Sequence, residues 1–495
     1  MTAQDVRMYL GQRLSVGFDG PVIPEEYENL IREYKIGNVI LFRRNVKDYA
    51  QLKALCASLR TLIKAETGLE PFIMIDEECG SVSRLGHIAG ATPSAMAIGA
   101  TNEKENAYRI GRIMGDELHA VGINFDLAPV LDCFTNPDNT VCGNRCFAKE
   151  PEKVASFGLE YIKGLQDAGI VACGKHFPGH GDTAVDSHLD LPIVNKSIEE
   201  MRTTELVPFS AAIRAGIGSI MSAHVVFPAI EPERVPSTVS HRVMTGLLRK
   251  ELGFNGIIVS DGMEMKAVMN LFGVEEGIRR ALNAGIDVAL ICHSADQAIA
   301  TICHLEKAYE EGTLSKENIE EHFQRIAACK SRLKPLHGGA PFGTQAQRDQ
   351  AQRIMEASIQ LLHAPEGKPL PPINGSTLFF GTLARRNALV NDDIPLNAAE
   401  QFAQAYGGVY AGLAPDREAD TAVVFLGRHP DAHITIDAAR KLAESGAKVI
   451  AVSLYTPRCL DFLPDNVWKI AAWQYDQLAV DALISQFPRL QAQGR

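Results

Sequence analysis

The sequence predicts a closed parallel (β/α)₈ barrel followed by a smaller C-terminal α/β sandwich domain. Three observations support this fold class. Short apolar, β-rich runs alternate with segments of helical period up to about residue 335. Polar residues directly follow several of these runs, and a second set of strand-like runs begins after a stretch rich in glycine and proline. The chain, at 495 residues, is also long enough for two domains.

Eight β-rich runs form the first set, and eight strand-then-helix units favour a closed barrel over the alternative, an open doubly wound sheet. The segment 151–169 illustrates the alternation, because proline opens it, glycine closes it, and apolar residues recur at intervals of three and four. The predicted strands are RLSVGF (13–18), NVILF (38–42), PFIMI (71–75), INFDL (123–127), GIVAC (169–173), GSIMS (218–222), GIIVS (256–260) and DVALIC (287–292).

Composition and pattern also divide the chain. Residues 1–335 are assigned to the barrel, and residues 336–375 to a linker with one helix, because glycine- and proline-rich segments surround the helical sequence RDQAQRIMEASIQLLH. Residues 376–495 are assigned to the second domain. Its strand-like runs are STLFFG, TAVVFLG, KVIAVSLY and KIAAWQY.

The composition narrows the range of partners. The net charge of −11 argues against binding to nucleic acid or to an anionic membrane, so we expect partners that are small or neutral. The sequence shows no apolar run of membrane-spanning length and no secretory signal segment, which favours the cytoplasm. Ten cysteines without a C-x-x-C pair fit a reducing compartment.

Polar residues that follow the predicted strands should meet at one end of the barrel. Active sites on this fold lie where the strands end and the following loops begin. Five of the eight runs are followed at once by titratable side chains, which predicts a convergent site. These side chains belong to Asp76, Lys175, His176, His224, Asp261 and His293.

Two groups are candidates for a catalytic pair. Asp261 lies at the lip of a buried strand, although the same aspartate could instead cap the next helix. His188 follows Asp186 by two residues in the loop KHFPGHGDTAVDSH (175–188). A carboxylate beside an imidazole favours its protonated form, so this histidine can act as a general acid near neutral pH. A solvated loop is the alternative interpretation.

A metal site is the rival explanation for this loop, since the loop is rich in histidine and aspartate. An H-x-x-x-H pair binds metal best on a helix, and the sequence FPG prevents a helix here. We therefore expect neither a metal ion nor another cofactor. The residues considered as ligands are His176, His180, Asp182, Asp186 and His188.

The motifs KHFPGHGDTAVDSHLDLP and VSDGMEM together resemble the β-N-acetylglucosaminidases of glycoside hydrolase family 3, known from bacterial cell-wall recycling. The resemblance covers essentially the whole predicted barrel and extends more loosely to the second domain. It includes GQRLSVGFDG, IGNVILFRRN, IDEECGSVSRL, INFDLAPVLD, GNRCFAKEP and MSAHVVFPAIEPERVPSTVS.

This resemblance implies a retaining, exo-acting hydrolase of N-acetylglucosaminides. It implies that Asp261 is the nucleophile and that a mobile loop carries His188 as the acid/base, oriented by Asp186. It implies no cofactor and a sugar as the partner. The residues that it implies as sugar contacts are Asp76, Arg84, Arg145, Lys175 and His176.

The chain departs from the family pattern in IDEECGSVSRL, where the usual form is closer to D-Q-E-G-G-R-V-x-R-L. Glu77, Cys79 and Ser81 replace glutamine, glycine and arginine. The backbone conformation at position 79 and the preferred leaving group can therefore differ from those of the family. Two other functions stay open: a phosphorylase that uses phosphate instead of water, and a β-glucosidase of the same family, against which the D-S-H motif argues. A sugar-binding protein without activity would require the loss of Asp261 or His188, and both are present.

Overall fold

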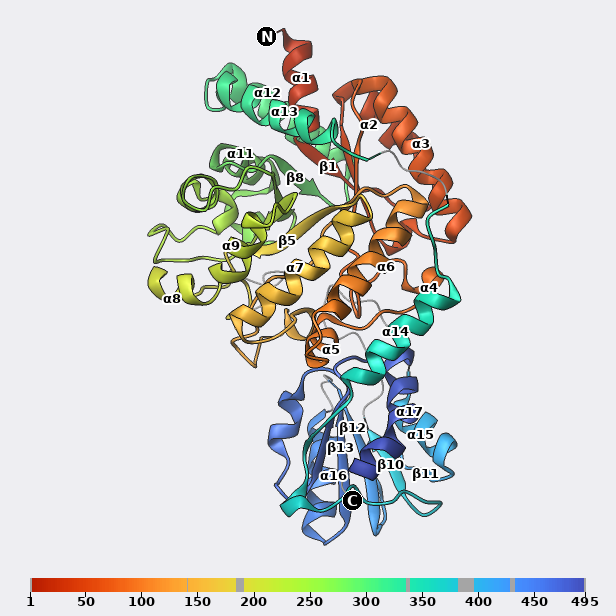
Figure 1. The fold of residues 1–495 in the computed structure, drawn as a ribbon. Coiled ribbons are helices and arrows are strands. Elements are labelled where there is room, and N and C mark those ends of the chain that lie inside the picture. The colour runs from red at the N-terminus through yellow and green to blue at the C-terminus, as the bar shows by residue number, and fades with distance from the viewer. Residues whose placement is uncertain are drawn as a thin grey trace.

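The computed structural model describes residues 2–139, 141–183, 191–334, 339–381, 396–427 and 432–493. Two α/β units lie end to end, with the N-terminus on the first and the C-terminus on the second (Figure 1). The first is a closed barrel of eight parallel strands and the second contains a six-stranded sheet. The predicted fold class is confirmed.

The barrel strands pair in chain order, and β1 closes the circle on β8. Each predicted run contains one strand, but β5 and β7 extend further than expected. The pairing register shifts at the ends of both strands, and such bulges redirect side chains. The strands are β1 (Leu14–Val16), β2 (Asn38–Leu41), β3 (Phe72–Ile75), β4 (Phe125–Asp126), β5 (Val171–Phe177), β6 (Ser219–Ser222), β7 (Ile257–Gly262) and β8 (Val288–Ile291).

Helices surround the barrel, and apolar side chains fill its interior. Phe72 and Phe125 meet edge to face inside it, with ring centroids 5.2 Å apart. Within the described part of the chain, no helix is long and apolar enough to cross a membrane. The main helices are α1 (Ala3–Gln12), α2 (Glu25–Tyr34), α3 (Tyr49–Thr67), α6 (Glu105–Val121), α7 (Pro151–Asp167), α9 (Leu206–Arg214), η4 (Arg242–Glu251), α11 (Val274–Ala284), α12 (Ala295–Glu310) and α13 (Lys316–Lys330).

The helix α7 shows how the sequence specifies these outer elements. Pro151 occupies its first position, where the missing N–H costs nothing, and the residues at helical spacing are buried toward the strands. The neighbouring helix α6 approaches α7 closely at Gly111, which has no side chain. A Cβ at this position would lie only 2.4 Å from the Tyr161 carbonyl oxygen. Shorter helical segments lie in the loops: η1 (Arg43–Asn45), α4 (Gly86–Ala89), α5 (Ala95–Ala100), η2 (Gly143–Arg145), α8 (Ile198–Thr203), η3 (Ser237–Val239) and α10 (Lys266–Phe272).

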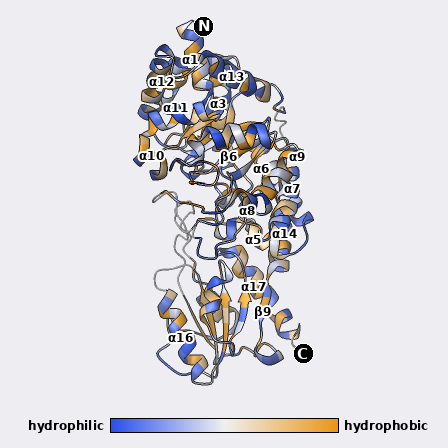
Figure 2. Ribbon diagram, turned by 90° about the vertical axis from the view of Figure 1, so that its left-hand side faces the viewer, coloured by the Kyte–Doolittle hydropathy of each residue, from blue (hydrophilic) through white to orange (hydrophobic). Residues whose placement is uncertain are grey.

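The second unit has three layers. Its sheet has the strand order β11-β10-β12-β13-β14-β9, and only β9 runs antiparallel to its neighbour. One face packs against α15 and α17, the other against α16, and apolar strands lie between them (Figure 2). The elements are β9 (Gln360–His363), β10 (Leu378–Gly381), α15 (Ala398–Tyr406), β11 (Val409–Tyr410), β12 (Thr421–Leu426), α16 (Ala432–Glu444), β13 (Lys448–Ser453), η6 (Pro457–Phe462), β14 (Trp468–Ala471) and α17 (Gln477–Gln493).

The segment 336–375 differs from the linker expected from the sequence. It contains α14 (Gln345–Ser358), as expected, but also β9, which is the antiparallel edge strand of the second sheet, and the short turn η5 (Pro365–Gly367). The second sheet therefore begins at Gln360. The sequence predicts QLLH as the end of the helix, because this segment follows the helix without a turn residue and continues its apolar pattern.

Hydrogen bonds join the two units beside the mouth of the barrel. The Trp473 carbonyl oxygen accepts from Ser94 Oγ at 3.1 Å and from Asn144 Nδ2 at 3.0 Å. The backbone at Gly143 runs so close to Tyr455 that a Cβ there would lie 2.0 Å from the phenol oxygen. The second unit thus supports the turn η2 of the barrel, which ends at Arg145.

Candidate active site

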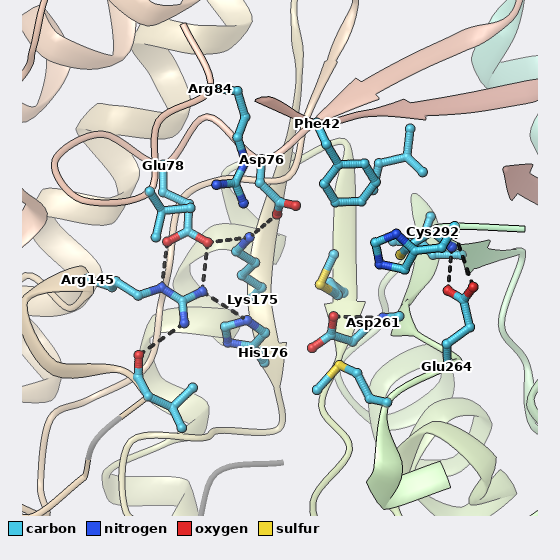
Figure 3. A pocket seen from close by; sticks show the side chains of 18 of the residues that line it. Phe42, Asp76, Glu78, Arg84, Arg145, Lys175, His176, Asp261, Glu264 and Cys292 are labelled. Carbon is cyan, nitrogen blue, oxygen red and sulfur yellow. Dashed lines mark hydrogen bonds and ion pairs between the residues drawn. The ribbon is translucent and has the colours of Figure 1, made fainter. Parts of the chain in front are cut away.

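A cavity of ≈ 830 Å³ opens at the carboxyl ends of the barrel strands (Figure 3). Its volume falls in the range typical of small-molecule sites. Side chains from the strand ends and from the loops after β2, β3, β4, β5, β7 and β8 line it. Of the residues singled out in the sequence, it brings together Asp76, Arg84, Arg145, Lys175, His176, His180, Asp261 and His293.

His224 is the exception, because it does not line the cavity. Its ring is fully buried, with Nδ1 2.8 Å from Thr238 Oγ1 and Nε2 3.0 Å from the Gly262 carbonyl oxygen. A carbonyl can only accept, so Nε2 carries a proton and donates it to Gly262. The prediction that His224 belongs to the convergent mouth is therefore wrong, and the residue instead holds the end of β7.

A chain of buried ion pairs forms one wall of the cavity. The Lys175 ammonium lies 2.7 Å from Asp76 Oδ1 and 2.5 Å from Glu78 Oε1. Arg145 makes two parallel bonds to the same Glu78 carboxylate, both 2.7 Å long. Although burial favours the neutral acid, the two cations hold the pKa of Glu78 well below its usual range. Glu78 therefore stays ionised, and the ion pairs of this wall are already formed before a ligand arrives.

Asp132 holds His176 against this wall. Arg145 donates to His176 Nε2 at 3.5 Å, and a guanidinium can only donate, so Nε2 is the accepting nitrogen. The proton is then on Nδ1, which donates to Asp132 Oδ2 at 2.7 Å. Burial lowers the pKa of His176, which keeps the imidazole neutral in this tautomer.

Asp132 also fixes the beginning of the histidine-rich loop. Its Oδ1 accepts the backbone N–H of His180 at 2.6 Å. Asn139 Nδ2 donates to the His180 carbonyl oxygen at 2.8 Å, and Thr183 Oγ1 lies 2.9 Å from the His180 ring. His188 and Asp186 lie in residues 184–190, outside the described residues. No group of three or more His, Cys, Asp or Glu residues suited to a metal ion occurs among the residues described.

Asp261 lies at the irregular end of β7 and faces the cavity (Figure 3). Its side chain is half-buried, and Oδ1 accepts the N–H of Gly262 at 2.7 Å. It does not cap the following helix, because α10 begins only at Lys266 and Met265 occupies the capping position. The carboxylate therefore borders the cavity and does not cap a helix.

The three departures from the family pattern have identifiable positions. Cys79 has φ +79°, a left-handed conformation that favours glycine, so the backbone keeps a glycine-like shape at a cost of about 1–2 kcal/mol. Glu77 accepts the N–H groups of Arg84 and Leu85 at 2.6 and 3.0 Å, and burial raises its pKa to about 7. Ser81 Oγ donates to Asn144 at 3.4 Å. These contacts fix the turn that carries Arg84.

Glu78 and Asp132 are two residues of this site that were not among the candidates from the sequence. Glu78 had a detectable signal, because residues two apart in an extended segment point to the same side and Asp76 was already a candidate. Asp132 had a weaker one, since it follows the fourth strand only after five further residues. Its role depends on contacts with residues more than forty positions away.

A (β/α)₈ barrel with a charged cavity at its strand ends is the architecture of an enzyme that acts on a small polar substrate. Residues 6–329 match the glycosyl hydrolase family 3 N terminal domain. The chain therefore belongs to glycosyl hydrolase family 3 and is a glycoside hydrolase, which confirms the resemblance seen in the sequence.

Named relatives agree with this assignment. Beta-hexosaminidase A of Pseudoalteromonas piscicida is 33% identical over 390 residues, which is 74% of this chain and 65% of the relative. Beta-hexosaminidase of Thiobacillus denitrificans is 36% identical over 61% of this chain and 80% of its own length. A family 3 beta-N-acetylglucosaminidase from Paenibacillus sp. has a similar structure, with a TM-score of 0.87, 34% identity, and coverage of 98% of this chain and 96% of that one.

Replacing Asp132 with asparagine should disturb the hydrogen bonding of His176 without changing the residues that line the cavity. An amide can accept at only one of its two positions, so a buried N–H of His176 or His180 loses its partner. We expect kcat/KM to fall about 5- to 150-fold, the equivalent of the 1–3 kcal/mol cost of an unsatisfied buried group. Nitrogen-15 NMR should show His176 shifting to the other tautomer or to a mixture.

The matched control is Asp138→Asn in the same loop, where the exposed carboxylate pairs with Arg458 at 3.2 Å. This variant should keep both the tautomer and the activity. An Asp132→Asn protein with an unchanged His176 tautomer and unchanged activity would contradict the positioning role.

Proposed function

We propose that the protein is a retaining, exo-acting β-N-acetylglucosaminidase that releases terminal N-acetylglucosamine. One observation carries this proposal: the Asp261 carboxylate faces a cavity whose wall is a fixed array of charged hydrogen-bonding groups. The names of the relatives above, beta-hexosaminidase and beta-N-acetylglucosaminidase, support the same activity. Cell-wall fragments are the natural substrates that we infer, and the resemblance of the motifs supports them.

The charged wall suits a sugar ring. Each sugar hydroxyl both donates and accepts, so it can bond a carboxylate and a cation at the same time. The wall supplies both kinds of partner in alternation, and charge-assisted hydrogen bonds are the stronger ones. Because the groups already hold one another in place, little reorganisation is needed when the substrate binds. The proposed sugar contacts are Asp76, Arg84, Arg145, Lys175 and His176.

The reaction that we propose is a double displacement. Asp261 attacks the anomeric carbon and the bond to the leaving oxygen breaks, while His188 gives that oxygen a proton. His188 then removes a proton from water, which attacks the glycosyl-aspartate and releases the sugar with its configuration retained. Asp186 favours the protonated histidine. No metal ion and no other cofactor takes part in this scheme.

The described residues on both sides of 184–190 support this role for His188. On one side, His180 lines the cavity and is tied to Asp132. On the other side, the Val194 N–H donates to the Val226 carbonyl oxygen at 3.0 Å, beside β6. His180 and Val194 are thus both held at the mouth of the barrel, on the side where the cavity opens.

Asp261→Asn should remove nearly all turnover and leave the fold intact, because an amide is too weak a nucleophile to form the glycosyl intermediate. A 5-fluoro glycosyl fluoride should label Asp261 in the wild type, as read by mass spectrometry of peptides. The exposed Asp296 on α12 provides the control, because the Asp296→Asn variant should still be labelled at Asp261, to the same extent as the wild type. Label on a different carboxylate would reject Asp261 as the nucleophile.

His188→Ala should slow substrates with poor leaving groups about 10²- to 10⁴-fold, the usual contribution of general acid catalysis. Substrates with good leaving groups need little protonation, so they should lose less in the first step. The measurement is kcat/KM across a series of aryl β-N-acetylglucosaminides of graded leaving-group pKa, with the exposed His241→Ala as the control. A uniform loss across the series would argue against His188 as the acid.

A further inference from the structure

The cavity has a second wall, opposite the ion pairs, to which the proposed chemistry assigns no role. Figure 3 shows Asp261 between the two walls, with Asp76, Glu78, Arg145 and Lys175 on one side. The other side is formed where β2, β7 and β8 end, and it combines aromatic and sulfur-containing side chains with charged ones. The residues of this second wall include Phe42, Glu264, Met265, Met269, Cys292 and His293.

A stack of three side chains forms the centre of this wall. The rings of Phe42 and His293 lie nearly parallel, with centroids 5.6 Å apart and planes inclined by 22°. The Arg44 guanidinium lies over Phe42, 4.4 Å from the ring centroid. Phe42 is half-buried in this stack, whereas His293 is exposed. The stack therefore offers the imidazole of His293 to the cavity.

Arg44 and Glu264 hold the stack in place. Arg44 pairs with Asp19 at 2.6 Å and donates to the Cys292 carbonyl oxygen, also at 2.6 Å. The two oxygens of Glu264 accept the backbone N–H groups of Cys292 and His293, at 2.5 and 3.2 Å. Glu264 follows Asp261 by three residues, so one short segment fixes both the carboxylate and the position of His293.

Cys292 does not offer a competing chemistry on this wall. Burial, together with the nearby carboxylates of Glu264 and Asp261, raises the pKa of its thiol well above the usual value. A thiol that stays protonated is a poor nucleophile and a poor metal ligand. The wall is thus a surface for packing. Met265 and the exposed Met269 border it with flexible side chains that adapt to different shapes.

We propose that this wall is the leaving-group subsite and that it binds a second pyranose ring, packed against the exposed face of His293. This inference rests on the proposed function. If the terminal sugar occupies the ion-paired wall and its anomeric carbon lies at Asp261, the leaving group extends into the remaining volume. One face of a pyranose presents C–H groups, and burying them on an aromatic ring gives both hydrophobic and dispersion stabilisation.

The test compares two substrates that differ in the leaving group. N,N′-diacetylchitobiose has a pyranose leaving group, whereas N-acetyl-β-glucosaminyl fluoride has only fluoride. His293→Ala should lower kcat/KM for the disaccharide by about tenfold, the order expected for loss of a ring-stacking contact, and leave that for the fluoride unchanged. His293→Phe retains an aromatic face and should restore most of the disaccharide activity. His304→Ala, on the outer surface of α12, is the control and should behave as the wild type on both substrates.

The possible outcomes separate this inference from the proposed function. A wild type that turns over the fluoride, with no disaccharide-specific loss in His293→Ala, would overturn the subsite and leave the hydrolase standing. Equal losses on both substrates would also overturn it, as would a His293→Phe variant as poor as His293→Ala. A wild type inactive on both substrates would overturn the proposed function and, with it, the leaving-group subsite.

Discussion

The site depends on the pair of buried ion pairs that the Glu78 carboxylate forms. This carboxylate bridges the Lys175 ammonium and the Arg145 guanidinium, and all three side chains are buried. Removing one partner of a buried ion pair typically costs about 3–5 kcal/mol, because the remaining charge has lost its solvent and its counter-charge. Here one carboxylate neutralises two cations from distant segments of the chain. The cations can therefore stay charged, and at fixed positions, before any ligand binds.

The rest of the structure supports this arrangement. The bulged end of β5 carries Lys175 and His176, and the bulged end of β7 carries Asp261. Arg145 ends the turn η2, which contacts the second unit through Asn144 and the backbone at Gly143. The small domain thus contributes to the shape of the barrel's mouth although none of its residues lines the cavity among those described. We infer that this support is the reason for the close contact between the two units.

The sequence predicts the barrel well because each strand is a short buried run and parallel strands all end on the same side. The same rule places Asp76, Lys175 and Asp261 in the cavity. The rule fails for His224. Side chains alternate between the two faces of a strand, and Met221 faces the cavity, so His224, three residues later, points to the other side. The rule also cannot find the stack of Phe42 on His293 or the link from Asp132 to His176. Phe42 and His293 follow β2 and β8, which come close only when the barrel closes. The contact of Asp132 with His176 depends on the course of the loop after β4.

The central claim is that Asp261 forms a covalent glycosyl intermediate rather than activating water. The stereochemistry of the first product tests it most directly. Proton NMR can follow an aryl β-N-acetylglucosaminide during the first minutes of cleavage, before the released sugar mutarotates. A double displacement predicts that the β-anomer of N-acetylglucosamine appears first and that the α-anomer grows only later. An α-anomer that appears first would contradict the account, because a single displacement by water inverts the configuration.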